Sequence, residues 1–83
     1  MLRIEFERTR RGLSQYTCGV LVRVHQPTLS LIEHGRYIPT PAVLQRFATL
    51  FGVPAESLLR PVTLIPVDDL QAFVEQHRSG AGR

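Results

Sequence analysis

The side chains that most often carry out catalysis are few in this sequence, and they do not form a catalytic set. Cys18 is the only cysteine, the three histidines lie far apart along the chain, and Asp68 and Asp69 are adjacent where a helix is expected to start. Helix capping accounts for that acidic pair. No nucleophile is paired with a base, no glycine-rich loop could hold a phosphate, and the spacing of His25 and His34 does not suit a metal. We therefore predict a protein that is not an enzyme and that needs neither a cofactor nor a metal.

Two glutamines stand where a different chemistry is possible. Gln15 and Gln26 each lie at the start of a predicted helix, where free backbone N–H groups and the positive end of the helix dipole favour a phosphate. Their amides can also hydrogen-bond to the backbone or to a base edge. Taken alone, Gln26 and Thr28 are better explained as ordinary solvated first-turn residues. The two glutamines are therefore candidates for binding, but their positions alone do not identify the ligand.

Length, composition and charge narrow the class of protein. The chain has 83 residues, about half of the roughly 150 expected per domain, so we expect one domain with one small core. Apolar residues make up 43% and charged residues 20%, which is too apolar for a wholly disordered chain. The net charge of +3 lies toward the N-terminal half, and every basic residue is arginine. Arginine suits phosphates and guanine edges, although its exclusive use can also reflect a composition bias.

The cysteine content and the apolar runs indicate where the protein works. A single cysteine excludes an internal disulfide framework, which favours a reducing interior. The N-terminus is charged from Arg3 onward, and no apolar run approaches the roughly 20 residues that cross a bilayer. We expect a cytoplasmic protein with no membrane partner. Cys18 is expected to fill a small apolar core site, with a redox switch as the alternative.

Glycine and proline divide the chain into short segments that predict an all-α fold. Ser14 and Thr40 are the predicted N-caps of two helices, and residues 15–22 would also permit a strand because they are rich in β-branched side chains. The last predicted helix carries an apolar stripe of Leu70, Phe73 and Val74. We predict helices at about residues 2–10, 15–22, 26–34, 41–51, 54–59 and 68–77, an extended connector at 62–66 and a loose tail at 79–83.

Several short motifs, taken together, resemble one known family. They are Gly-Leu-Ser-Gln at 12–15, Gln-Pro-Thr-Leu-Ser-Leu-Ile-Glu-His-Gly-Arg at 26–36 with Pro39 behind it, Leu44 with Phe47-Ala48, Phe-Gly-Val-Pro at 51–54, and Leu58-Leu59. This pattern resembles the helix-turn-helix DNA-binding domain of phage repressors and Cro proteins, the Xre type, over about residues 2–61. The resemblance implies a compact five-helix lambda-repressor-like domain at 1–61. An additional C-terminal helix would follow within 62–78, beyond the resemblance, and a flexible tail at 79–83.

The resemblance also implies roles for particular residues. The third helix would enter the major groove of double-stranded DNA, with Gln26 on an adenine and Leu31, facing outward, against a thymine methyl. The residues implied to contact bases are His25, Gln26, Pro27, Thr28 and Leu31, and those implied to contact the DNA backbone are Ser14, Gln15, His34, Arg36 and Tyr37. For Arg36 the alternative is a cation that only stabilises a helix C-terminus, and an exposed Leu31 needs no function. Arg8 and Glu33 are implied to form a partly buried ion pair.

The chain departs from the family pattern inside the motif. The turn between the second and third helices usually holds a glycine in the left-handed conformation, whereas Arg23 stands there, at an expected cost of about 1 kcal/mol. Gly19 stands where the family prefers alanine, and Tyr16-Thr17 replaces a more usual acidic pair. We expect these changes to alter the angle between the helices and not the fold.

The expected function is a sequence-specific transcriptional regulator, a homodimer that recognises a palindromic operator. The alternative is a protein-interaction module, such as an antitoxin or an adaptor, that uses the same fold. The last predicted helix bears on both, because its apolar stripe could complete the core in the same chain or pair with a second chain.

Overall fold

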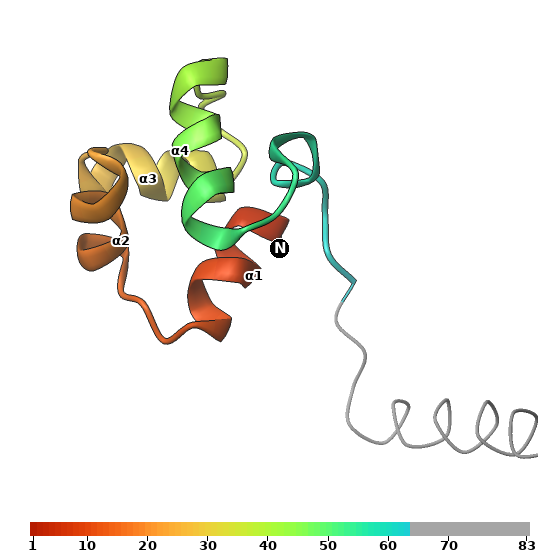
Figure 1. The fold of residues 1–83 in the computed structure, drawn as a ribbon, viewed down its shortest axis with the longest axis horizontal. Helices are drawn as coiled ribbons and strands as arrows, with labels where there is room; N and C mark the ends of the chain where they lie inside the picture. The colour runs from red at the N-terminus through yellow and green to blue at the C-terminus, as the bar shows by residue number, and fades with distance from the viewer. Residues whose placement is uncertain (64–83) are drawn as a thin grey trace, which may run out of the picture.

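The computed structural model describes residues 1–63 and contains four α-helices within that range. They are α1 (Arg3–Arg10), α2 (Gln15–Val22), α3 (Gln26–Glu33) and α4 (Pro41–Phe51), followed by a single 3₁₀ turn, η1 (Ala55–Ser57). The only β-type pairing among these residues is one isolated bridge between Leu2 and Pro61. The predicted all-α class is therefore confirmed for this part of the chain, and Figure 1 shows the arrangement.

Side-chain caps fix the starts of α2 and α4 where the sequence predicts them. The Ser14 hydroxyl accepts a hydrogen bond from the backbone N–H of Thr17 at 3.0 Å, and the Thr40 hydroxyl accepts one from Val43 at 3.3 Å. Each bond satisfies one of the N–H groups that the first turn of a helix leaves free. Both predicted caps are thus confirmed.

The free backbone N–H groups at the start of α1 are hydrogen-bonded to backbone carbonyls of a distant segment. The backbone N–H of Arg3 donates to the carbonyl of Arg60 at 2.8 Å, and the N–H of Ile4 donates to that of Leu58 at 2.9 Å. These long-range bonds replace a side-chain cap, which Leu2 cannot supply. The residues after η1 therefore lie against the N-terminus, as Figure 1 shows.

The turn between α2 and α3 is tight and takes the conformation that the sequence predicts. Arg23 has φ 60° and ψ 46°, and it is the only residue other than glycine with positive φ among those described. Val24 donates its N–H to the carbonyl of Gly19 at 2.8 Å, which gives the hydrogen-bonded ending known as a Schellman motif. Arg46 of α4 donates to the carbonyl of Val22 at 3.3 Å and helps to close the same helix end.

One core holds the helices together. Both α2 and α4 carry buried side chains toward it, and α4 packs against α1, α2 and η1. The helical outcome for residues 15–22 follows from this packing, because Cys18 and Val22 lie one turn apart and are both buried. The buried apolar residues are Ile4, Cys18, Val22, Leu29, Ile32, Phe47, Ala48, Phe51 and Leu58.

The prediction of a fifth α-helix is wrong, because that segment contains a 3₁₀ turn instead. Residues 54–59 form only the 3₁₀ turn η1, in which the Ser57 hydroxyl donates to the carbonyl of Pro54 at 2.7 Å. Pro54 and Pro61 bracket too few residues for an α-helix to establish repeated hydrogen bonds. Leu58 is nevertheless buried, so the segment still contributes one side chain to the hydrophobic core. The predicted last helix at 68–77 and the tail at 79–83 lie outside the described residues.

Candidate nucleic-acid interface

The outward face of α3 combines one amide with apolar side chains. Leu29 and Ile32 are buried, whereas Gln26, Pro27 and Leu31 are exposed. Leu31 is 43% exposed, which confirms that it faces outward as predicted. Pro27 and Leu31 are four residues apart and lie on the same side of the helix. An α-helix with such a face fits the width of a DNA major groove.

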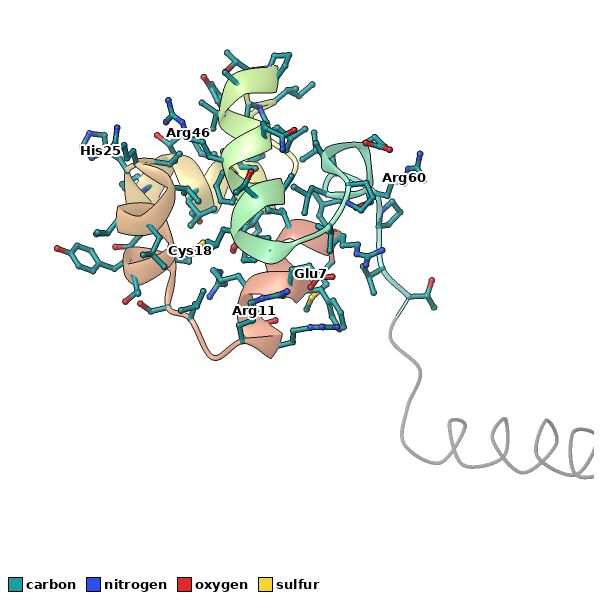
Figure 2. All side chains as sticks on the ribbon, viewed as in Figure 1. Glu7, Arg11, Cys18, His25, Arg46 and Arg60 are labelled. Atoms are coloured by element: carbon teal, nitrogen blue, oxygen red, sulfur yellow. The ribbon has the colours of Figure 1, made fainter. Side chains whose placement is uncertain are left out.

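The start of α3 is open to solvent. His25 is its N-cap, is exposed and makes no side-chain cap bond, and Figure 2 shows its ring pointing outward at the edge of the molecule. Thr28 is only half-buried. All five residues implied to contact bases therefore lie on α3 or at its N-cap, four of them exposed.

The residues implied to contact the DNA backbone come from two segments. Ser14 and Gln15 lie at the start of α2, while His34, Arg36 and Tyr37 follow α3 and are exposed. Gln15 Nε2 donates to Glu33 Oε1 at 2.9 Å, which places the start of α2 beside the end of α3. His34 and Arg36 border one hollow at the end of α3, whereas Tyr37 lines another hollow together with His25 and Thr28 at the start of α3.

The first of these segments is already partly occupied by internal contacts. The Ser14 hydroxyl serves as the cap of α2 and also bonds to Thr17 Oγ1 at 3.0 Å. An amide nitrogen carries two hydrogens, so Gln15 keeps one for an outside acceptor after its bond to Glu33. Of this pair, Gln15 has the better side-chain donor for a phosphate.

Arg8 and Glu33 form the expected pair, and it ties three helices together. Arg8 Nε lies 2.6 Å from Glu33 Oε2 and Arg8 Nη2 lies 3.1 Å from Glu33 Oε1, a two-bond geometry. These bonds raise the pKa of Arg8, although burial acts in the opposite direction. Glu33 is the last residue of α3 and also accepts a hydrogen bond from Gln15 of α2. This carboxylate therefore fixes the orientation of α3 relative to α1 and α2.

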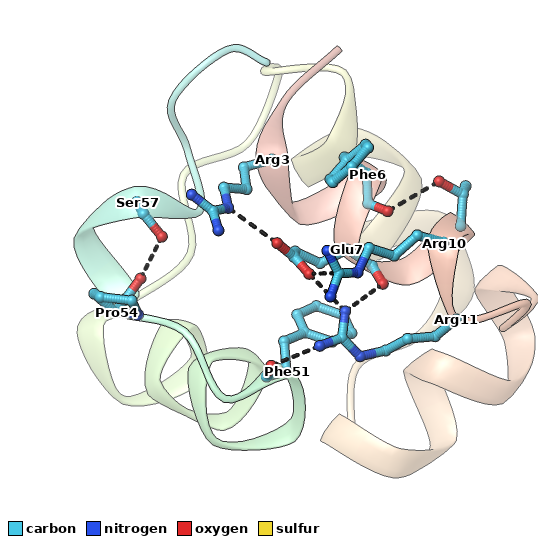
Figure 3. Close-up of polar contacts among 9 residues, drawn as sticks. Arg3, Phe6, Glu7, Arg10, Arg11, Phe51, Pro54 and Ser57 are labelled. Carbon is cyan, nitrogen blue, oxygen red and sulfur yellow. Dashed lines mark hydrogen bonds and ion pairs between the residues drawn. The ribbon is translucent and has the colours of Figure 1, made fainter. Parts of the chain in front are cut away.

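A second buried carboxylate was missed by the sequence analysis. Glu7 is buried in α1 and is surrounded by three arginines, as Figure 3 shows. Its oxygens lie 2.6 Å from Arg11 Nη1, 3.0 Å from Arg3 Nε and 3.4 Å from Arg10 Nε. Burial alone would raise the pKa of Glu7, but the hydrogen bonds from Arg11 and Arg3 outweigh it and hold the pKa below the ordinary value. The i, i+4 spacing of Arg3, Glu7 and Arg11 was the available signal.

Comparison with known proteins settles the family. The sequence model of the family described as "Helix-turn-helix domain" matches residues 5–60, which is more than half of the chain. The chain belongs to the helix-turn-helix domain family. The match agrees with the resemblance to phage repressors and Cro proteins. No curated protein matches the chain.

Membership of the helix-turn-helix family indicates a DNA-binding regulator, since in such domains the second helix of the motif lies in the major groove. Here that helix is α3. Domains of this family are typically non-enzymatic. None of the helices in residues 1–63 has the length and apolarity needed to cross a membrane.

The remaining reactive side chain of the helix-turn-helix domain is structural. Cys18 is fully buried, and burial raises the pKa of its thiol to about 11. The thiol is therefore protonated at neutral pH, which favours the core role over the redox switch.

Proposed function

We propose that this protein is a sequence-specific regulator of transcription that binds double-stranded DNA as a homodimer on a palindromic operator. The observation that carries the proposal is the outward face of α3, where Gln26 and Leu31 are exposed above a buried Leu29 and Ile32. Gln26 would make a bidentate pair of hydrogen bonds to an adenine, and Leu31 would contact a thymine methyl. His25, Pro27 and Thr28 would flank these two contacts.

Backbone contacts would hold α3 in register. We assign them to Ser14, Gln15, His34, Arg36 and Tyr37, which flank α3 in the chain. The net charge of +3 is modest, so non-specific affinity should be weak and steeply salt-dependent. Base contacts and the avidity of a dimer would then supply selectivity.

The dimer is part of the proposal because one α3 covers only a few base pairs. Two copies related by a twofold axis would contact half-sites about 34 Å apart. We assign the DNA-binding domain to residues 1–61 and either core completion or dimerisation to residues 62–78. The apolar stripe of Leu70, Phe73 and Val74 would serve one of these two roles.

Selection of bound duplexes from a random pool at about 150 mM salt tests this function. The expected result is an enriched inverted repeat whose half-site centres are about one helical turn apart. Sedimentation of the full chain with and without that duplex gives the stoichiometry. Binding that vanishes as salt rises, with no enriched sequence, would contradict the proposal.

A second candidate function, protein interaction, is favoured by the surface of α2. Tyr16, Val20 and Leu21 are 68%, 60% and 54% exposed, which is unusual for neighbouring apolar side chains on one helix. An open hollow of about 390 Å³ lies between this surface and the start of α3, lined in part by Tyr16, Val20 and Gln26. Leu21→Ser separates the candidates, because Leu21 is exposed on α2 but does not line the hollow that contains Gln26; it should leave DNA selection intact and weaken only protein contacts.

A further inference from the structure

The end of α3 holds a histidine whose hydrogen-bond geometry fixes which ring nitrogen faces outward. His34 is the C-cap of α3, and its Nδ1 lies 2.7 Å from the carbonyl oxygen of Ser30. A carbonyl oxygen only accepts hydrogen bonds, so Nδ1 must carry the hydrogen. In the neutral ring, Nε2 therefore has a lone pair and no hydrogen to donate.

This ring borders an open hollow that has the size and charge for an anion. The hollow has a volume of about 270 Å³ and is lined by Ser30, Leu31, His34 and Arg36. Arg36 is exposed, and no ion pair holds its guanidinium among residues 1–63. Leu31 belongs to the face that we assign to bases, so the hollow lies where that face meets the backbone-contacting segment.

The other charged side chains near α3 do not line this hollow. On α3 itself, Glu33 is buried against Arg8 of α1. Arg46 of α4 is held by the carbonyl of Val22, and Arg23 lies at the far end of the motif. None of these side chains, nor the phenol of Tyr37 in the following loop, lines the hollow. His34 and Arg36 are thus the two groups that determine its charge.

We propose that this hollow takes a DNA phosphate and that His34 takes up a proton when it does so. This inference rests on the proposed function. A phosphate oxygen is an acceptor, so the neutral Nε2 lone pair offers it nothing, and the carbonyl end of α3 is itself partly negative. Protonation from solvent turns Nε2 into a donor and adds a positive charge beside Arg36. DNA binding is then coupled to proton uptake.

The coupling predicts tighter binding at lower pH. Histidine is the side chain whose charge ordinarily changes between about pH 5 and 8. A phosphate within hydrogen-bonding reach favours the charged form of the ring. We therefore expect binding to be tighter at about pH 5.5 than at about pH 8.0, at constant salt, by on the order of tenfold for each copy of His34 in the complex.

The experiment measures binding of the full chain to a duplex of about 20 base pairs across this pH range. The probe is the selected inverted repeat or, if none is enriched, a mixed-sequence duplex. His34→Gln keeps a donor for the phosphate but cannot change charge, so it should bind with little pH dependence. Glu56→Gln, which removes an exposed titratable group on η1, is the control and should keep the wild-type pH dependence. Calorimetry in two buffers of different ionisation enthalpy counts the protons taken up.

The outcomes separate this inference from the function on which it rests. DNA binding that does not change with pH, a His34→Gln variant that keeps the full pH dependence, or a Glu56→Gln variant that loses it would each overturn the proton coupling alone. Failure to bind either duplex at any pH would overturn the proposed function, and the coupling with it. Thermal melting of each variant at each pH shows that the fold is the same throughout.

Discussion

At the scale of single residues, Gln26 and Arg36 should separate base recognition from phosphate contact. Gln26→Ala should cost roughly 1–3 kcal/mol on the preferred duplex and relax the preference at one base pair, because it removes a two-bond contact. Arg36→Ala should weaken all duplexes to a similar extent, since phosphates carry no sequence information. Affinity measured by fluorescence anisotropy on preferred and scrambled duplexes checks both. If the two variants lower affinity equally on every sequence, the assignment of these roles is wrong.

The buried carboxylate of Glu33 should matter more for folding than for DNA contact. Glu33→Ala strands the Arg8 guanidinium, which lies 2.6 Å from Glu33 and is itself mostly buried. We expect a loss of roughly 3–5 kcal/mol in the free energy of unfolding, enough to unfold a domain of this size. Urea or thermal unfolding followed by circular dichroism measures it. Glu56→Ala, at an exposed position in η1, is the control, and an unchanged melting temperature for Glu33→Ala would refute the role of the pair.

At the scale of elements, the sequence predicts the four α-helices well and their connections less well. Helix starts depend on local chemistry, which is why Ser14 and Thr40 could be identified as caps. The strand alternative for residues 15–22 is excluded only by packing against α3 and α4, which no local pattern contains. The pairing of Glu7 with its arginines is local, at i, i+3 and i, i+4 spacing, but the bond from Arg11 to the carbonyl of Phe51 joins distant segments and is not contained in that pattern. The outward direction of Leu31 was predictable because helical periodicity alone determines it.

Gly19 lowers the helix propensity of α2, and its presence is explained by the close approach of α2 to the turn between α2 and α3. A Cβ placed on Gly19 would collide with the backbone carbonyl oxygen of Val24. Gly19→Ala should therefore lose about 1–3 kcal/mol through overpacking, which exceeds the gain of up to about 1 kcal/mol in helix propensity. Leu21→Ala, on the exposed side of the same helix, should change stability by no more than about 0.5 kcal/mol. A stabilised Gly19→Ala variant in denaturant unfolding would show that the turn can move freely.

The turn itself stores strain that a glycine would relieve. Arg23 has φ 60°, a conformation that costs a residue with a Cβ about 1 kcal/mol. Arg23→Gly should raise the free energy of unfolding by about that amount, while Arg23→Ala keeps the Cβ and should not. Denaturant unfolding of the three proteins makes the comparison. Equal stability of the glycine and alanine variants would mean that the strain is absent.

At the scale of the whole molecule, the arginines around Glu7 also contact segments far from α1 in the sequence. Arg3 beside it donates its backbone N–H to the carbonyl of Arg60, and Arg11 donates to the carbonyl of Phe51 at the end of α4 at 2.7 Å. The Arg11 guanidinium also lies 5.0 Å from the centre of the Phe51 ring. One buried negative charge thus orients the cation of Arg11 that holds α1 against the end of α4, while the backbone of Arg3 binds the chain after η1.

This arrangement should make stability depend on pH in the acid range. The pKa of Glu7 is lower in the folded state than its ordinary value of 4.5, so the folded state binds fewer protons there. The stabilisation is fully present above about pH 4.5 and is lost as the pH falls through the folded value. Thermal melting between about pH 7 and 2 should show a decline that begins below pH 4.5.

Glu7→Gln isolates the contribution of this residue to the acid decline. The variant should melt lower at neutral pH, because three arginines lose their counter-charge, and it should decline less steeply in acid because no proton binds at position 7. Glu56→Gln removes an exposed carboxylate and should keep the wild-type decline. If Glu7→Gln declines as steeply as wild type, acid sensitivity originates at other carboxylates, and the arginines around Glu7 contribute to stability through packing and not through charge.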